Sequence, residues 1–460
     1  MKKFIIFLIS FIILISSFVF SANAAFTTAV EIESPIAYLV SLDDDGTVIY
    51  DKNSTLKAEP ASLTKIVTAI LVIENCTDYE AVVTAPSYAI RLLDGTNSST
   101  AGILVGEQLT VRQLLYCLLV YSANDAANVL ADYIGGGSID TFIGMMNDFA
   151  QKLGCTDTHF ANAHGLFDEN HYSTAKDLAV MYRYCLENSF FSELAGTSYY
   201  KIEPTNKYAQ TRHLNSTNKM FSSGIADYYY KYLKNGKTGT NNSWNRCFIS
   251  SASKDGYSYL CVILDAPMYD VDKDGVDENM SFMDTKTLYS WTFDHIRLRT
   301  VANTSTYVTE VSVKLSNEYD YVSLVPANEV NALVPTGVDE SGVYVEALTE
   351  LTASSVNAPV KKGDVLGKAV IKYADDVIAE VDLVAAFDVS LSSVKYIGNL
   401  MLTLMKSTAF KIALAFVVLV ILPACILLFV IIPSKRRKKK SQIRIVNVND
   451  IENRRKNIKK

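Results

Sequence analysis

Hydrophobic positions recur every three or four residues between residues 59 and 75, where the chain reads EPASLTKIVTAILVIEN. This period predicts a helix whose apolar face consists of Ile66, Ala69, Ile70 and Ile73. Pro60 is typical of a helix start, so Ser62 and Lys65 are expected one turn apart near the N-terminus of this helix. A serine N-cap followed by a surface lysine is the plain alternative, because Ser-x-x-Lys arises by chance about once or twice in a chain of this length.

Strand patterns enclose this helix within the first 300 residues. Residues 38–50, YLVSLDDDGTVIY, predict two short strands around an Asp-Gly turn, and the run YSYLCVIL after Gly256 predicts a buried strand. Residues 109–134 are apolar with helical spacing on both sides of a polar interruption at 122–125, and residues 282–296 predict a closing amphipathic helix. Strands at both ends with helices between them predict an α+β domain, a mixed sheet backed by helices.

A different pattern begins near Arg299. Short alternating runs rich in β-branched residues are separated by Asn, Pro, Gly and Asp turns, and they lie at residues 307–315, 321–327, 342–351 and 376–389. These runs predict a small all-β domain that ends near Ser390. We therefore expect two domains, at residues 25–298 and 299–390.

The N-terminus has the three-part layout of a secretory signal peptide. Two lysines precede an apolar run that reaches Phe20, and the small-residue pattern Ala22-Asn23-Ala24 follows. Cleavage is expected after Ala24, which makes residues 1–24 the signal peptide. The apolar run is somewhat long, so an uncleaved N-terminal anchor is the alternative. In both cases the rest of the chain is expected to be exported.

The C-terminal part of the sequence predicts a membrane anchor. Residues 391–410 are amphipathic and could lie on the membrane surface, and residues 411–433 form an apolar run of about the twenty residues that a bilayer core requires. The basic run SKRRKKK then opens a tail, residues 434–460. By the positive-inside rule this tail is cytoplasmic, and the domains before the single span lie on the extracytoplasmic side of the cell membrane.

Composition narrows the classes of function. The chain has 460 residues, 49% of them hydrophobic and 20% charged, so it can bury a sizeable core. Its net charge is -6 and its basic stretch is confined to the tail, which argues against nucleic-acid binding by the body of the protein. The seven cysteines lack the close spacing of a metal site, and no disulfide pairing can be assigned. Neither a metal nor another cofactor is predicted.

Three polar motifs interrupt the apolar pattern of the first domain. After Ser62 and Lys65 comes Ser122-Ala123-Asn124, which offers a hydroxyl and a carboxamide two residues apart, and then Lys237-Thr238-Gly239. A fixed Lys-Thr-Gly is expected by chance only about once in several thousand residues. Ser-x-x-Lys, Ser-Asp-Asn and Lys-Thr-Gly together form the signature of penicillin-binding proteins and class A β-lactamases.

The chain resembles exported D-alanyl-D-alanine carboxypeptidases, which are low-molecular-mass penicillin-binding proteins of the serine type. Beyond the three motifs the likeness rests on residues 158–179, 215–221 and 358–367, and it extends from Phe26 to about Ser390. It implies a transpeptidase-like catalytic domain at residues 25–298. It also implies that the substrate is a peptidoglycan stem peptide ending in D-Ala-D-Ala and that β-lactam antibiotics acylate the site.

The resemblance implies a catalytic role for four residues. Ser62 would attack the carbonyl between the two D-alanines, and Lys65 would be its general base, because burial and a nearby cation lower the pKa of an amine. Ser122 would pass a proton to the departing D-alanine. Asn124 would orient Lys65 and the substrate amide.

The resemblance also implies four substrate-binding residues, Lys237, Thr238, Gly239 and Thr240. The first two would hold the terminal carboxylate of the substrate, and the glycine would let the strand approach the ligand closely. Backbone N–H groups of Ser62 and Thr240 would form the oxyanion hole.

The sequence differs in two ways from the signature of class A β-lactamases, and these differences help to separate a carboxypeptidase from a β-lactamase. Ala123 stands where the signature has Asp, and no counterpart of the deacylating glutamate motif of class A β-lactamases is evident. Both favour a carboxypeptidase over a β-lactamase. A D,D-endopeptidase that uses the same site and a non-catalytic wall-binding protein remain as alternatives, although the latter would not need Ser62 paired with Lys65.

Two further features receive structural interpretations. His164 lies in NAHGLF, which matches the family, but a lysine-based mechanism needs no imidazole, so we expect a role in the loop. Residues 270–281 begin like an EF-hand calcium loop, yet Ser281 occupies the position that requires Glu. We therefore expect a solvated loop there.

Overall fold

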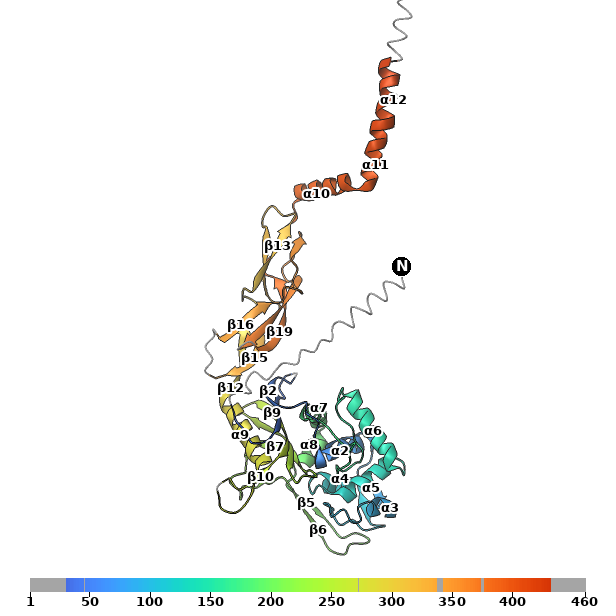
Figure 1. Ribbon diagram of the computed structural model, residues 1–460, viewed down its shortest axis with the longest axis vertical. Coiled ribbons are helices and arrows are strands. Elements are labelled where there is room, and N and C mark those ends of the chain that lie inside the picture. The colour runs from blue at the N-terminus through green and yellow to red at the C-terminus, as the bar shows by residue number, and fades with distance from the viewer. Residues whose placement is uncertain (1–29, 45, 272, 337–341, 374–375, 432–460) are drawn as a thin grey trace, which may run out of the picture. The chain divides into compact units, whose positions relative to one another are not determined.

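Figure 1 shows the computed structural model, which describes residues 30–431 except 45, 272, 337–341 and 374–375. The predicted signal peptide, residues 1–24, and the predicted tail, residues 434–460, lie outside the described residues. The chain divides into two compact units. The first consists of Met1–Asn303, Asn328–Glu346 and Ala369–Val381, and the second of Thr304–Ala327, Ala347–Lys368 and Asp382–Lys460.

A five-stranded sheet forms the centre of the first unit. Its order is β2-β1-β9-β8-β7, and its strands are β1 (Ile36–Ser41), β2 (Val48–Lys52), β7 (Leu233–Thr240), β8 (Arg246–Lys254) and β9 (Tyr257–Ala266). The predicted α+β class is confirmed. The expectation of a mixed sheet is wrong, since every neighbouring pair in this sheet is antiparallel. Short turns join β7 to β8 and β8 to β9, and each turn reverses the direction of the chain.

Successive side chains of the central strand β9 enter two separate hydrophobic cores. Leu260, Val262 and Leu264 contribute to one core, whereas Cys261 and Ile263 contribute to the other. All five are fully buried. A strand places alternate side chains on opposite faces of a sheet, so a strand that is covered on both faces must be apolar throughout.

Helices supply the cover on both faces (Figure 1). The first core contains residues of α2 (Lys65–Asn75), α4 (Val111–Leu119), α5 (Asn124–Ile134), α6 (Ile139–Lys152), α7 (Ala175–Leu186) and α8 (Ser189–Gly196). The second core contains residues of α9 (Met280–His295), which confirms the helix predicted at 282–296. The expected amphipathic pattern is wrong, since the buried side of α9 includes Asp284, Thr285 and Thr292 as well as apolar residues. The helix predicted at 59–75 begins as a 3₁₀ turn, η2 (Ala61–Thr64), and continues as α2, which is buried from Lys65 to Ile73.

Shorter elements complete the first unit. Pairs of antiparallel strands are formed by β3 (Val82–Thr84) with β4 (Gln108–Thr110), by β5 (Tyr199–Ile202) with β6 (Arg212–Asn215), and by β10 (Met268–Tyr269) with β11 (Glu278–Asn279). Helix α3 (Ser87–Arg91) follows β3. Strand β12 (Ile296–Ala302) pairs with β15 (Val330–Pro335).

The remaining strands confirm the predicted β-rich region after Arg299. Their order in a six-stranded sheet is β16-β18-β19-β14-β13-β17, with β13 (Thr309–Lys314), β14 (Tyr321–Pro326), β16 (Val343–Ala347), β17 (Ser355–Asn357), β18 (Val365–Tyr373) and β19 (Asp376–Ala385). Buried residues of β13 and β14 alternate with half-buried or exposed ones, which accounts for the period of two in the sequence.

The C-terminal part of the described chain is helical. α10 (Ser393–Lys406) has no buried residue, and α11 (Thr408–Phe416) and α12 (Leu422–Ile426) belong to a candidate membrane span, Thr408–Phe429, with a mean hydropathy of 3.2. Ser407 caps α11 by accepting a hydrogen bond from Phe410 N, so the amphipathic segment and the apolar segment are separate helices.

Candidate active site

The first motif lies at the junction of η2 and α2. Lys65 Nζ donates hydrogen bonds to Ser62 Oγ over 2.8 Å and to the carbonyl of His164 over 2.6 Å. A helical turn places residues i and i+3 on one face, which is why Ser62 and Lys65 meet. Lys65 is fully buried, so its ammonium has been removed from water.

Burial controls the acid–base behaviour of Lys65. Desolvation disfavours the ammonium and, together with the charge of Lys237, places the pKa of Lys65 well below its usual value, against a weaker opposing effect of Asp125. A lysine with a lowered pKa can be a neutral amine near neutral pH. Such an amine, next to a serine hydroxyl, is suited to general-base catalysis.

The second motif forms the break between α4 and α5. Ser122 has a φ of +64°, in the left-handed region that residues other than glycine seldom adopt. Its Oγ accepts a 2.7 Å hydrogen bond from Lys237 Nζ. The polar residues between α4 and α5 therefore have a structural reason: they hold Ser122, in a constrained backbone conformation, within hydrogen-bond distance of Lys237.

Asn124 begins α5 immediately after this break. Its backbone N–H donates to the carbonyl of Ser99 over 2.8 Å, and its side-chain Oδ1 is buried with no hydrogen-bond partner among the described residues. Next to it, the carboxylate of Asp125 accepts from the N–H groups of Ala101 and Ile103. Hydrogen bonds to residues 99–103, which precede β4, therefore hold the second motif in place. The Oδ1 atom of Asn124 remains available to accept a hydrogen bond.

The third motif is the last part of β7. Lys237 is buried and donates to the carbonyl of Thr238 over 2.8 Å as well as to Ser122, and burial lowers the pKa of Lys237 to about 7. Thr238 Oγ1 lies 2.5 Å from Thr217 Oγ1. Thr240 is exposed at the end of the strand.

Gly239 brings β7 close to the turn that carries Ser62, the candidate nucleophile. A Cβ at this position would lie 3.2 Å from the Cβ of Ala61 and 3.3 Å from the carbonyl oxygen of Pro60. The sequence suggested that this glycine serves close approach to a ligand, and the structure shows close approach to the backbone that carries Ser62. Hydrogen bonds join Ser62 to Lys65 and Ser122 to Lys237.

His164 contacts the first motif through its main chain. Its carbonyl accepts from Lys65, while its Nδ1 accepts from Leu166 N. Burial lowers the pKa of His164 to about 3, and the charge of Lys65 acts in the same direction. The imidazole is consequently neutral at physiological pH and serves the loop, in agreement with the expected structural role.

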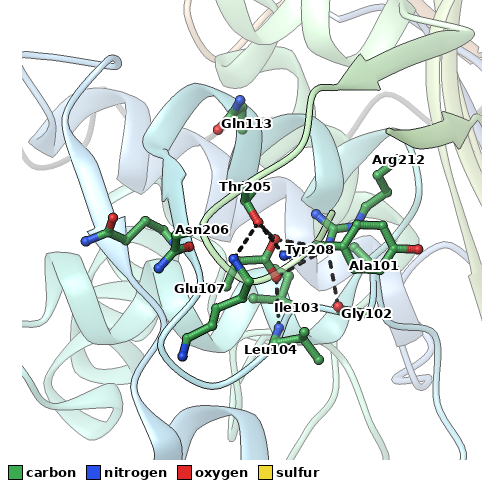
Figure 2. Close-up of polar contacts among 12 residues, drawn as sticks. Ala101, Gly102, Ile103, Leu104, Glu107, Gln113, Thr205, Asn206, Tyr208 and Arg212 are labelled. Carbon is green, nitrogen blue, oxygen red and sulfur yellow. Dashed lines mark hydrogen bonds and ion pairs between the residues drawn. The ribbon is translucent and has the colours of Figure 1, made fainter. Parts of the chain in front are cut away.

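The segment that holds Asn124 is itself fixed by a buried ion pair that sequence reasoning missed. Figure 2 shows Glu107, just before β4, against Arg212, the first residue of β6; the nearest charged atoms lie 3.1 Å apart. Glu107 also accepts from Leu104 N and from Thr205 Oγ1. Arg212 stacks on Tyr208, with 4.5 Å between the guanidinium carbon and the ring centre. No local pattern marks this pair, because 105 residues separate its members.

The loop at residues 270–281 and the cysteines are the sequence features that bear on metal binding. The carboxylate of Asp270 accepts from the N–H groups of Asp274 and Gly275, so the loop after β10 binds its own backbone. Among the described residues, no group of three or more His, Cys, Asp or Glu side chains is arranged to hold a metal ion, and the seven cysteines are unpaired.

Comparison with known proteins shows which family the chain resembles. A family model described as D-alanyl-D-alanine carboxypeptidase matches residues 22–268, and a model described as the C-terminal domain of penicillin-binding protein 5 matches residues 297–390. The D-alanyl-D-alanine carboxypeptidase DacF of Bacillus subtilis is 28% identical over 369 residues, which cover 80% of this chain and 88% of that protein. DacC of Escherichia coli is 27% identical over 365 residues, which cover 76% of this chain and 84% of that protein.

The fold also resembles solved structures. The crystal structure of penicillin-binding protein 5 from Haemophilus influenzae aligns with a TM-score of 0.57 and 22% identity, over 79% of this chain and 99% of that one. Since the carboxypeptidase model matches more than half of the sequence, this chain belongs to the D-alanyl-D-alanine carboxypeptidase family and is a serine-type D-Ala-D-Ala carboxypeptidase with a C-terminal domain of the penicillin-binding protein 5 type.

Proposed function

We propose that this enzyme removes the terminal D-alanine from peptidoglycan stem peptides through an acyl-enzyme on Ser62. The observation that carries the proposal is the 2.8 Å hydrogen bond between Ser62 Oγ and the buried Lys65 Nζ. A serine hydroxyl is a weak nucleophile until a base takes its proton. Lys65, with its lowered pKa, is the base that lies within reach.

Acylation begins when Ser62 Oγ attacks the carbonyl carbon of the D-Ala-D-Ala bond and its proton passes to Lys65 Nζ. The tetrahedral intermediate carries a negative oxygen, which the backbone N–H groups of Ser62 and Thr240 stabilise. Collapse of the intermediate breaks the C–N bond and leaves the ester on Ser62.

The departing D-alanine needs a proton on its amine. The Ser122 hydroxyl passes its proton to this amine and takes in return the proton that Lys65 received from Ser62, so Lys65 is again a neutral amine. Lys237, whose Nζ donates to Ser122 Oγ over 2.7 Å, keeps its own proton. Water then attacks the ester carbonyl while the neutral Lys65 takes one of its protons, and Lys65 returns this proton to Ser62 Oγ as the ester C–O bond breaks. A β-lactam follows the same first step, but its ring opens without losing a fragment.

Substrate binding uses the third motif and Asn124. A charged Lys237, with the hydroxyl of Thr238, holds the terminal carboxylate, and Gly239 keeps the strand close to the nucleophile turn. The buried Oδ1 of Asn124, which lacks a partner among the described residues, accepts from the N–H of the substrate amide. A buried acceptor is favourable only when a donor pairs with it, so this position of Oδ1 suits a peptide N–H.

We further propose the arrangement at the membrane. The span Thr408–Phe429 anchors the protein as a single-pass protein of the cell membrane, with the catalytic domain (25–298) and the β-rich domain (299–390) on the extracytoplasmic side. The amphipathic segment 391–410, which contains α10, lies at the membrane surface. The basic tail faces the cytoplasm.

The test is mass spectrometry of the full-length enzyme in detergent with penicillin and, separately, with a peptide ending in D-Ala-D-Ala. A long-lived adduct on Ser62 together with release of one D-alanine would support the proposal. Rapid penicillin hydrolysis without peptide cleavage would indicate a β-lactamase. Cleavage of cross-linked peptides would indicate an endopeptidase, and the absence of both adduct and turnover would indicate a wall-binding protein.

A further inference from the structure

The carbonyl of Ala61, the residue before Ser62, is held from two sides. Thr64 Oγ1 donates a 2.8 Å hydrogen bond to it. Gly165 packs against it so closely that a Cβ at this glycine would lie 1.8 Å from the carbonyl oxygen. Ala61 itself has a φ of +48°, which a residue with a Cβ adopts only when its surroundings impose it.

His171 extends this arrangement by one more hydrogen bond. Its Nε2 lies 2.7 Å from Thr64 Oγ1, and its Nδ1 accepts from the N–H of Ala161 over 3.0 Å. Because Nδ1 is an acceptor, the proton of the neutral ring is on Nε2. The direction of the chain is therefore fixed: His171 donates to Thr64, and Thr64 donates to Ala61.

The surroundings keep this tautomer in place. His171 and Thr64 are both buried, and the His171 ring meets Phe160 edge-on with 5.7 Å between ring centres. Burial lowers the pKa of His171 to about 4; nearby Asp168 opposes this effect, and His159 and Lys65 add to it. A neutral ring is needed, since a proton on Nδ1 would face the N–H of Ala161.

The held carbonyl belongs to the same peptide unit as the N–H of Ser62. A trans peptide is planar, and its C=O and N–H point in opposite directions. Any group that fixes the Ala61 carbonyl therefore also aims the Ser62 N–H, which in the proposed mechanism is a donor of the oxyanion hole. We infer that His171 and Thr64 are positioning residues that orient this donor, an inference that rests on the function proposed above.

The experiment measures acylation by penicillin in full-length enzyme, separating the dissociation constant of the first complex from the rate constant of the chemical step. A second readout is the affinity of a peptide boronic acid, whose tetrahedral adduct on the serine places an oxygen in the oxyanion hole. Thr64→Val removes the hydroxyl at nearly constant shape, and Thr64→Ser restores it. His171→Ala and the double variant Thr64→Val/His171→Ala complete a cycle.

For Thr64→Val we expect the rate constant to fall about 10-fold to 100-fold, less than for loss of a whole oxyanion donor, with boronate affinity falling in parallel. The dissociation constant of the first complex should change by less than about twofold. Thr64→Ser should recover most of the rate. The double variant should match Thr64→Val, because both residues act through one chain of hydrogen bonds.

Two controls separate positioning from loss of stability. Ser34→Ala removes a buried hydroxyl that donates to Asp284; the backbone N–H of Ser34 also donates to Asp284, over 2.8 Å. This contact lies on the opposite side of the sheet from α2. The substitution should therefore lower the melting temperature but leave the rate constant unchanged. Glu169→Ala replaces an exposed residue two positions before His171 and should change neither.

A rate constant and boronate affinity within about twofold of wild type in folded Thr64→Val and His171→Ala would overturn the inference. A fall in both that Ser34→Ala reproduces at equal loss of melting temperature would also overturn it. If Thr64→Val or His171→Ala fails to fold, the remaining one of the two, together with Thr64→Ser, still tests the inference. Failure of the wild-type enzyme to form an adduct on Ser62 would instead contradict the proposed function.

Discussion

Lys237 Nζ donates a 2.7 Å hydrogen bond to Ser122 Oγ, and this contact joins two motifs that lie 115 residues apart. The lysine comes from a strand and the serine from a break between helices, so only the packing of helices on the sheet brings them together. The contact also places a second cation near Lys65, whose pKa it helps to lower. One pair of residues thus serves both substrate binding and activation of the nucleophile in the proposed mechanism.

Ser62→Ala should abolish labelling by a fluorescent penicillin and release of D-alanine, because Ser62 supplies the one hydroxyl that accepts from Lys65 within the described part of the chain. Gel fluorescence after denaturation measures the label. Ser223→Ala, at an exposed serine, is the control and should label like wild type. Labelling that persists in Ser62→Ala would contradict the assignment of the nucleophile.

The pH profile of acylation should be bell-shaped. Lys65 must be neutral, so the rate falls as pH drops through its lowered pKa; Lys237 must be charged, so binding weakens as pH rises through its own pKa of about 7. The charges of the two lysines interact, so the apparent pKa values of the acidic and alkaline limbs belong to the pair and not to either lysine alone. Lys237→Arg should shift the alkaline limb to higher pH, since a guanidinium stays protonated. A profile of Lys237→Arg that superimposes on wild type would contradict this account.

Arg212→Met should destabilise the catalytic unit by about 3 to 5 kcal/mol, because Glu107 would be left buried without its cation (Figure 2). Urea unfolding monitored by tryptophan fluorescence measures the change. The exposed pair Lys201 and Glu203 on the same hairpin provides the control, and Lys201→Ala should leave the unfolding midpoint unchanged. Equal effects of the two substitutions would show that burial of the ion pair does not matter.

Gly165→Ala should impair acylation and stability far more than Gly154→Ala. Both glycines have positive φ, +88° and +78°, so both substitutions incur backbone strain of roughly 1 to 2 kcal/mol. Only at Gly165 would the new methyl group overlap the Ala61 carbonyl, whereas Gly154 has open space around its Cβ direction. Melting temperature and acylation rate, measured on both variants, test the difference; similar values for both would contradict it.

Truncation after Lys406 removes the candidate span and should move the enzyme from the membrane fraction to the soluble fraction. Its acylation rate in detergent should stay within about twofold of the full chain, since the site residues come from elements between residues 61 and 240. Cell fractionation followed by penicillin labelling measures both. A truncated chain that stays in the membrane fraction would show that α10 or the N-terminal apolar run anchors it.

Local patterns determined much of this protein. Apolar runs, their spacing and turn residues predicted the helix formed by η2 and α2, a helix at α9, the β1–β2 pair and the β-rich region after Arg299, because each depends on residues close together in the chain. The three motifs could be found for a similar reason. Ser62 and Lys65 lie one turn apart, and polar residues at 122–125 stand out against an apolar background.

Tertiary structure decided what depends on residues far apart in the chain. The central sheet depends on the pairing of β1 with β9, two strands far apart in the sequence, which no local pattern contains. The Glu107–Arg212 ion pair and the hydrogen bonds from His171 through Thr64 to Ala61 join segments about 100 residues apart, and each of those residues, taken alone, reads as an ordinary polar position. The pKa of Lys65 is lowered by full burial and by the charge of Lys237. Both causes require the folded chain, because the amine loses its water only when other residues pack around it.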